Sequence, residues 1–119
     1  MPDLSRKEVI QILATTQQAR LAGVDLSGLD LTGLNFSGAD LIRANLSGAD
    51  LSFAYLRNAM LENANLQGAI FANANLKEAN LKGCNIKGAD LFGTNLTDAN
   101  LSGVELDPVQ ITQARGLLK

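Results

Sequence analysis

Large apolar residues recur at every fifth position of the chain, so residues 19–108 read as 18 consecutive pentads without insertion or deletion. An α-helix repeats near 3.6 residues and a strand near two, so neither explains a strict period of five. The pattern predicts a coil in which every pentad makes the same bend. The central residues of the pentads are Leu21, Leu26, Leu31, Phe36, Leu41, Leu46, Leu51, Leu56, Leu61, Leu66, Phe71, Leu76, Leu81, Ile86, Leu91, Leu96, Leu101 and Leu106.

The remaining pentad positions carry small and turn-forming residues. Two residues before the centre, 12 of 18 positions are Ala, and one residue before it, 13 of 18 are Asp or Asn. Two residues after the centre stand ten of the eleven glycines. Glycine tolerates a positive φ, and Asn and Asp side chains bond nearby backbone in turns. We therefore expect a turn in every pentad, with the centre and the Ala position facing inward.

This A-[DN]-L-x-x pattern resembles the pentapeptide-repeat family, and the resemblance covers 18 consecutive pentads. It implies an all-β solenoid, a right-handed quadrilateral β-helix with four pentads per coil and the central residues stacked on the axis. Residues 19–108 would then form about 4.5 coils, a tower roughly 22 Å tall at the usual strand spacing. Each coil buries its apolar face only against its neighbours.

Residues 1–18 precede the repeats and predict a helix. Ser5 and Glu8 have the spacing of a capping box, and Val9, Ile10, Leu13 and Ala14 follow helical periodicity. We expect one amphipathic helix over 5–18. Because the end of a solenoid exposes backbone and apolar side chains, this helix is expected to cap the first coil.

Residues 109–119 predict a second, short capping helix. Asp107 precedes Pro108, a common order at a helix start, and Gly116 indicates its end. Ile111, Ala114 and Leu118 can share one face. The alternative is an incompletely covered C-terminal end through which two chains dimerise, as some members of the family are thought to do.

Four large apolar residues occupy positions that should point outward: Phe53, Tyr55, Ile70 and Phe92. In a four-sided coil, Phe53, Ile70 and Phe92 fall on one side and Tyr55 just round the corner. Exposed apolar patches mark interaction surfaces more often than scattered single residues do. Three interpretations stay open: cover by a terminal helix, tolerated drift on the surface, or a site for a partner or a second copy.

Polar residues 20 positions apart would stack in columns under the family geometry. Asn45, Asn65 and Asn85 form one column, for which amide bonds between stacked strands are expected. Asp30, Asp50 and Asp90 form another, interrupted by Ile70, and are expected to cap turns, with a cation site as the alternative. Lys77, Lys82 and Lys87 would lie on three successive sides and form a ring rather than a phosphate-binding stripe.

Composition narrows the function classes. The 119 residues include 12 acidic and 10 basic side chains, one Cys and no His or Trp. These counts exclude a disulfide scaffold, a histidine metal site and a strongly basic nucleic-acid binder. Cys84 occupies the small inward position and is expected to be a buried, inert thiol. Without a nucleophile–base pair or a metal cluster we expect neither enzymatic activity nor a cofactor.

Neither a signal peptide nor an apolar run of 18 residues stands out, so we expect a cytoplasmic protein that binds no membrane. The favoured function is a structural or protein–protein interaction module with an unidentified protein partner or as a homodimer. The alternative is a regulator that imitates DNA and protects DNA gyrase, as some family members do. A net charge of −2 is close to neutral for such a mimic.

Overall fold

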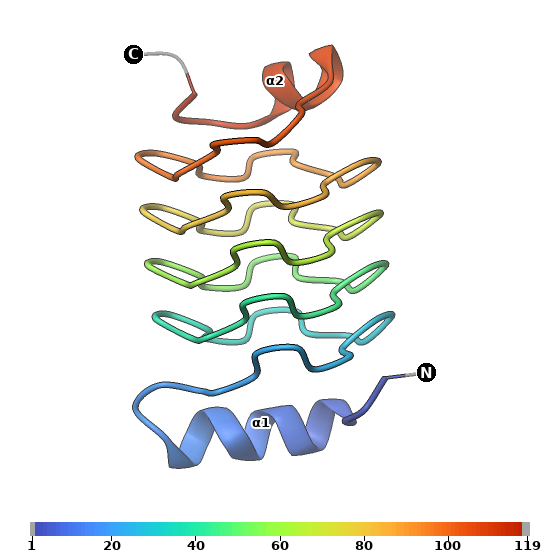
Figure 1. Ribbon diagram of the computed structural model, residues 1–119, viewed down its shortest axis with the longest axis vertical. Coiled ribbons are helices and arrows are strands. Elements are labelled where there is room, and N and C mark those ends of the chain that lie inside the picture. Colours follow the sequence, from blue (N-terminus) through green and yellow to red (C-terminus); the bar gives the residue numbers. More distant parts are fainter. Residues whose placement is uncertain (1, 118–119) are drawn as a thin grey trace.

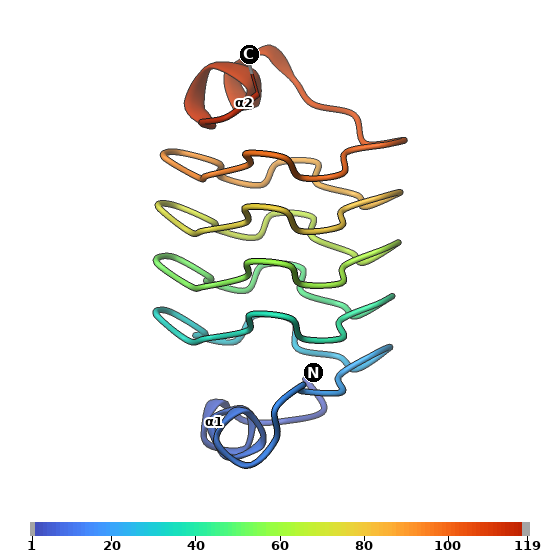
Figure 2. The same ribbon diagram turned by 90° about the vertical axis from the view of Figure 1, so that its left-hand side faces the viewer.

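The computed structural model describes residues 2–117, which form a tower of stacked coils with a helix at each end (Figures 1 and 2). Its principal extents are 37 × 26 × 22 Å. Parallel single-residue bridges join every fifth residue, the one before a pentad centre, to the residue 20 positions later, from Arg20–Asp40 through to Asn80–Asn100, and again at Asn95–Arg115. A register of 20 residues is what four pentads per coil require. Each bridge involves one residue, so residues 2–117 contain no extended strand.

Seventeen of the 18 pentads bend through the same turn. The N–H three residues after the centre donates to the carbonyl of the centre, as Ala44 does to Leu41 at 3.0 Å. The residue two positions after the centre lies inside this turn. Its φ is positive in 17 successive pentads, from Gly23 to Gly103. This geometry is that of a type II turn, which favours glycine at that position.

The Asp or Asn that precedes 13 of the 18 centres caps its turn with its side chain. Its Oδ1 atom accepts from the N–H two residues on, as Asn45 accepts from Ser47 at 3.0 Å and Asp50 from Ser52 at 3.0 Å. Asp and Asn are interchangeable here because both present the same oxygen. The side chains of Asn45, Asn65 and Asn85 therefore bond within their own turns, and the expected amide bonds between stacked asparagines are not the ones that form.

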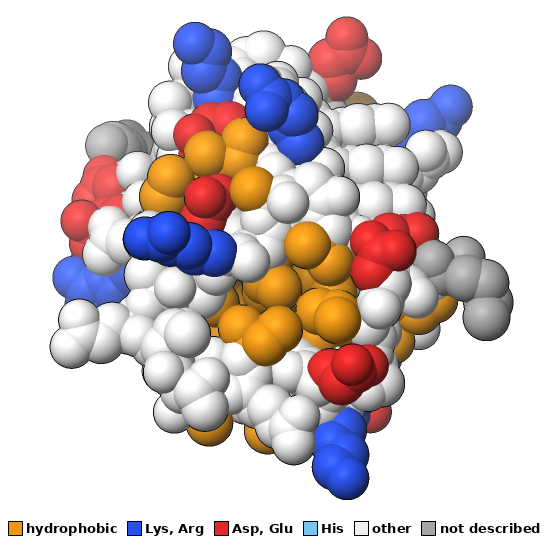
Figure 3. Space-filling model, turned by 60° about the horizontal axis from the view of Figure 1, so that its bottom comes forward, with side chains coloured by type: hydrophobic (Ala, Val, Ile, Leu, Met, Phe, Trp, Pro, Cys, Tyr) orange, Lys and Arg blue, Asp and Glu red, His pale blue; other side chains and the backbone are white. Residues whose placement is uncertain are grey.

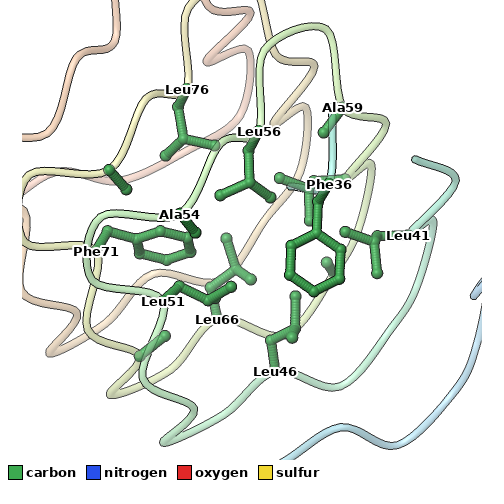
Figure 4. Packing of buried hydrophobic residues seen from close by; sticks show 14 of the residues in the cluster. Phe36, Leu41, Leu46, Leu51, Ala54, Leu56, Ala59, Leu66, Phe71 and Leu76 are labelled. Atoms are coloured by element: carbon green, nitrogen blue, oxygen red, sulfur yellow. The ribbon is translucent and has the colours of Figure 1, made fainter. Parts of the chain in front are cut away.

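The core is a column of apolar side chains on the tower axis. Every central residue from Leu21 to Leu96 is buried, and Figure 4 shows Phe36 and Phe71 pointing inward among the leucines. The expectation that all 18 centres are buried fails at the last two, because Leu101 and Leu106 are only half-buried. No complete coil lies above them.

Helix α1 (Arg6–Thr15) lies across one end of the tower. The predicted capping box is present: Ser5 Oγ accepts from the Glu8 N–H at 3.2 Å, and Glu8 Oε1 accepts from the Ser5 N–H at 2.9 Å. The helix ends at Thr15, three residues before the predicted end. Of the predicted apolar face, Val9 is buried, whereas Ile10 is 40% exposed. Ala14 is exposed as well.

Helix α2 (Pro108–Gln113) lies at the other end and is shorter than predicted. Asp107 is its N-cap, as expected, but the helix stops before Gly116, and Ile111 is 44% exposed. Leu118 lies outside the described residues. After the helix the chain rejoins the stack, because Arg115 bridges to Asn95 in the 20-residue register. Thus α2 takes the place of one side of a coil.

Residues outside the repeats bond to backbone groups of the first and last coils that have no neighbouring coil. At the first coil, the Asp25 carbonyl accepts from the Asp3 N–H at 2.6 Å, and Arg6 donates to the carbonyl of Asp30 at 2.7 Å. At the last coil, Gln110 Nε2 donates to the carbonyls of Ile86 and Ala89 at 2.8 and 3.0 Å. Gln110 is 3% exposed, and nothing in the repeat pattern singles it out.

Candidate interaction face

The four outward apolar residues gather on neighbouring turns of three consecutive coils. The Phe53 N–H donates to the Ala72 carbonyl at 2.9 Å, and the Asn73 N–H donates to the Phe92 carbonyl at 2.8 Å. The segment 72–73 therefore lies between Phe53 on one coil and Phe92 two coils away. Ile70 lies on the middle coil, two residues before this segment. We call Phe53, Tyr55, Ile70 and Phe92 the aromatic corner.

The aromatic corner is open to solvent. Phe53 is 63% exposed, Phe92 60% and Tyr55 55%, while Ile70 is half-buried. The helices lie at the two ends of the tower (Figures 1 and 2), and neither covers these rings. Cover by a terminal helix, one of the three interpretations drawn from the sequence, is therefore wrong for the aromatic residues.

Phe53 occupies an unfavourable backbone conformation. Its φ is +61°, in the turn position that glycine fills in ten pentads. A bulky side chain in this left-handed region costs on the order of 1–3 kcal/mol. Since the ring is largely exposed, burial does not offset that cost. The residue therefore lowers the stability of its own turn.

Tyr55 and Ile70 stand where Asp or Asn caps the turn in most pentads. Neither side chain offers an oxygen to the N–H two residues on, so both turns lose the local bond that Asp50 and Asn75 provide in theirs. Met60 departs from this rule too, on another side of the tower. Tyr55 and Ile70 differ from it because they share one corner with Phe53, so three departures from local preference coincide there. Such sites are commonly functional.

Carboxylates flank the aromatic corner on one side. Asp50 and Asp90 bridge to Ile70 from the coils on either side of it. Asp30, at the end nearest α1, pairs with Arg6 at 3.3 Å. Its pKa is lowered because the carboxylate accepts hydrogen bonds from the Thr32 hydroxyl and N–H. The Asp column therefore caps turns, and within residues 2–117 no group of three or more His, Cys, Asp or Glu residues could hold a metal ion.

Cys84 is buried, as predicted, with 4% of its surface exposed. Its Sγ–H donates to the Leu61 carbonyl at 2.8 Å, and Thr94 donates to Phe71 in the same way at 2.7 Å. Burial raises the pKa of the Cys84 thiol to about 11. The thiol therefore stays protonated near neutral pH, where a reactive cysteine needs thiolate.

Two shallow hollows lie near the ends of the tower. One of about 520 Å³ lies where the chain leaves the stack toward α2, and Cys84, Lys87, Glu105 and Gln110 are among its lining residues. Another of about 590 Å³ lies beside the end of α1, lined by residues that include Ile12 and Arg20. Neither hollow holds the aromatic corner.

The end of the tower that bears α1 also exposes apolar surface. Figure 3 shows hydrophobic side chains in the middle of this end, with acidic residues beside them. Leu13 of α1 and Val24 and Leu29 of the first coil pack against the core but are only partly buried. Helix α1 thus covers only part of the first coil. Over the described residues, no helix is long and apolar enough to cross a membrane.

Comparison with known proteins agrees with the repeat. The family model described as pentapeptide repeats (8 copies) matches residues 19–58, 49–88 and 84–115. The chain is similar to the solved structure of HetL from Nostoc sp. strain PCC 7120, a pentapeptide repeat protein involved in the regulation of heterocyst differentiation. The TM-score is 0.59 at 28% identity, over 85% of this chain and 44% of HetL, so the chain spans less than half of the HetL length.

Two further solved structures share the fold. A second pentapeptide repeat protein of Nostoc PCC 7120 is 28% identical with a TM-score of 0.56, over 90% of this chain and 79% of the other. QnrB1, a plasmid-mediated fluoroquinolone resistance protein, is 17% identical with a TM-score of 0.51, over 78% and 82%. No curated protein sequence matches significantly. Because the family model spans most of the chain and the 20-residue register matches its architecture, the chain belongs to the pentapeptide-repeat family, whose members form right-handed quadrilateral β-helices.

Proposed function

We propose that this chain is a non-enzymatic interaction module that binds a protein partner through the aromatic corner. One observation carries the proposal: Phe53, Tyr55 and Ile70 each replace the residue that their own turn favours, and they do so on neighbouring turns, two of them with exposed rings. A loss of local stability at several neighbouring positions is expected at a functional site.

The tower is a rigid support for such a site. Each backbone segment of the corner is bonded to the coils on both sides of it, and the interior behind it is closely filled with Leu and Phe side chains. A rigid scaffold lowers the entropy lost on binding. The buried, protonated Cys84 supports a role without catalysis and is compatible with the cytoplasmic location expected from the sequence.

We propose further that α1 and α2 cap a β-helix of about 4.5 coils. Three side-chain or N-terminal contacts support this role: Asp3 and Arg6 bond the outer edge of the first coil, and Gln110 bonds the outer edge of the last. These groups occupy carbonyls that would otherwise be open to pairing with another chain.

A DNA-mimicking regulator of DNA gyrase is the alternative function, and the fold it shares with QnrB1 does not decide between the two. Mimicry calls for a long, strongly negative face. We favour the interaction module because Lys and Arg side chains are distributed over three sides of the tower and the net charge is −2. Inhibition of gyrase supercoiling by the purified protein would favour the mimic instead.

Phe53→Gly tests the aromatic corner, with Arg43→Gly as the matched control. Arg43 has a φ of +58° in the equivalent turn of another side. Both variants relieve a left-handed turn, so each is expected to raise stability by about 0.5–1 kcal/mol, roughly 2–5 °C in Tm. Only Phe53→Gly is expected to abolish partner capture from a native lysate, measured by quantitative mass spectrometry against the unmodified protein.

The opposite result would be equally informative. If Phe53→Gly captures the same proteins as the unmodified chain, the aromatic corner is not the binding site. Light scattering coupled to size-exclusion chromatography separates self-association from partner binding: a dimer that Phe53→Gly dissociates would make the partner a second copy. A dimer that survives the substitution would place self-association elsewhere.

A further inference from the structure

The side of the tower that carries Ile70 and Phe92 has a charge unlike the other three. Its outward residues lie in the segments 28–33, 48–53, 68–73 and 88–93, which contain three Asp and no Lys or Arg. Two guanidinium groups bond to this side near its ends: that of Arg6, at Asp30 near α1, and that of Arg115, whose Nε–H donates to the Gly93 carbonyl at 3.2 Å near α2. Asp50 and Asp90, beside the aromatic corner, have no cationic partner among the ion pairs of the described residues.

The lysine ring is interrupted at this side. Lys77, Lys82 and Lys87 take the position after the centre on three successive sides, and the next member of the series is Phe92. A cation that would neutralise the Asp column is thus replaced by an exposed aromatic ring. Acidic groups beside exposed rings suit a cation, because a guanidinium pairs with carboxylate and also stacks on an aromatic face.

Resting on the function proposed above, we propose that the aromatic corner and the Asp column bind an extended, arginine-bearing segment of the partner that runs along the tower axis. The Oδ1 atoms of Asp50 and Asp90 accept from their own turns, through the N–H groups of Ser52 and Phe92. Among the hydrogen bonds of residues 2–117, none involves the Oδ2 atom of either side chain. A guanidinium can therefore pair with each carboxylate without opening a turn.

The spacing of the tower sets the spacing of the arginines. Asp50 and Asp90 lie two coils apart, with Ile70 between them, which is roughly 10 Å at the usual strand separation. A chain in the polyproline II conformation rises about 3.1 Å per residue with three residues per turn, so side chains at i and i+3 lie on one face about 9 Å apart. The segment would then carry Arg at positions i and i+3, with an apolar residue between them turned toward the rings of the aromatic corner.

The experiment is a titration of ¹⁵N-labelled protein with a blocked nonapeptide that has arginines three residues apart, a leucine between them, and Ala or Ser elsewhere. We expect amide shifts confined to 50–53, 70–73 and 90–93, and none with the peptide whose arginines are replaced by glutamate. Shifts spread over the lysine-bearing sides, equal binding of the glutamate peptide, or no shifts at millimolar peptide would overturn the proposal.

Asp50→Asn combined with Asp90→Asn is the decisive variant. Asn keeps the Oδ1 cap, as it does at Asn45, so the fold is retained while the charges are removed. We expect about tenfold weaker peptide binding, whereas Asp40→Asn, whose Oδ1 caps Ile42 on another side, should leave binding unchanged. Equal affinity of the double variant and the unmodified protein would contradict the inference.

The outcomes separate this inference from the proposed function. Should partner capture depend on Phe53 while the arginine peptide fails to bind, the charge argument is wrong and the interaction module stands. Should the peptide bind through Asp50 and Asp90 while neither it nor any partner responds to Phe53→Gly, the aromatic corner is wrong as a binding site.

Discussion

The middle of the tower and its two ends satisfy the hydrogen bonds of the backbone with different groups. In the middle, the Ala79 carbonyl accepts from the backbone N–H of Asn100, 21 residues later, at 2.9 Å. At the last coil, the Ala89 carbonyl accepts from Gln110, again 21 residues later, but from its side chain. A repeat satisfies its own backbone wherever a neighbouring coil exists, and unique residues must do so where none exists.

The largest difference is expected from a charge placed in the middle. Leu66 is fully buried in the column of central residues, so Leu66→Asp would bury an unpaired carboxylate and abolish folding. Lys77→Ala changes an outward position in the same region and should leave the Tm within about 2 °C. Circular dichroism melts of the two variants check the comparison. Equal melting curves would contradict the division into inward and outward positions.

Removal of the Gln110 side chain, which replaces the missing neighbouring coil at the C-terminal end, should give the next largest loss of stability. Gln110→Ala leaves the Ile86 and Ala89 carbonyls without the donor that Gln110 provides, and it removes a buried side chain. We expect a loss of about 2–3 kcal/mol in the free energy of unfolding. Gln67→Ala, at an exposed position in the middle, is the matched control and should cost less than about 0.5 kcal/mol. Denaturant titration measures both, and equal losses would show that Gln110 is dispensable.

Arg6, which bonds the first coil at the N-terminal end, is more exposed than Gln110, so its removal should cost less stability. Arg6→Ala removes the donor to the Asp30 and Thr32 carbonyls and the ion pair with Asp30. The guanidinium is partly solvated, so we expect a loss of about 1 kcal/mol. Lys7→Ala on the same helix should be neutral. Hydrogen exchange should report faster opening of the first coil in Arg6→Ala, and unchanged protection there would refute a capping role for Arg6.

Cys84 offers the mildest probe of the middle. Burial raises its pKa to about 11, above the usual value of 9.0, so folding favours the neutral thiol. The contribution of this group to stability is therefore present below pH 9 and is lost as the pH rises from 9 to 11. In the folded protein at pH 8, iodoacetamide should modify Cys84 slowly, and denaturant should accelerate the reaction to the rate of a free thiol. Rapid modification of the folded protein would show that the tower opens at this coil.

Much of the middle could be predicted because the conformation of each pentad depends on the residues within it. The central Leu, the small residue two positions earlier and the Asp or Asn between them specify one turn locally, and repetition makes the neighbours of every middle coil alike. The buried column, the turn-capping Asp side chains and the buried Cys84 followed from that pattern. Four pentads per coil did not, because a period of five alone does not set the number of sides.

The ends were predicted less well because they lack the repeat. Helical periodicity placed Ile10 and Ala14 on the packed face of the first helix, yet the helix rests on the first coil along a narrower edge and leaves both exposed. The pattern of the second helix suggested Ile111 as its inward residue, whereas the buried side chain is that of Gln110. A polar residue that completes two backbone bonds carries no hydrophobic signal.

The sequence by itself determined the repeating turn, the inward column and the identity of the four anomalous outward residues, because each depends on chemistry within one pentad. The family geometry already predicted that Phe53 and Phe92 share a side and that Ile70 interrupts the Asp column. Only the tertiary structure showed the backbone bonds that join Phe53 and Phe92 to the segment 72–73, and the replacement of a missing coil by Gln110. These relations join residues about 20 to 40 positions apart, and the stacking of coils brings them together.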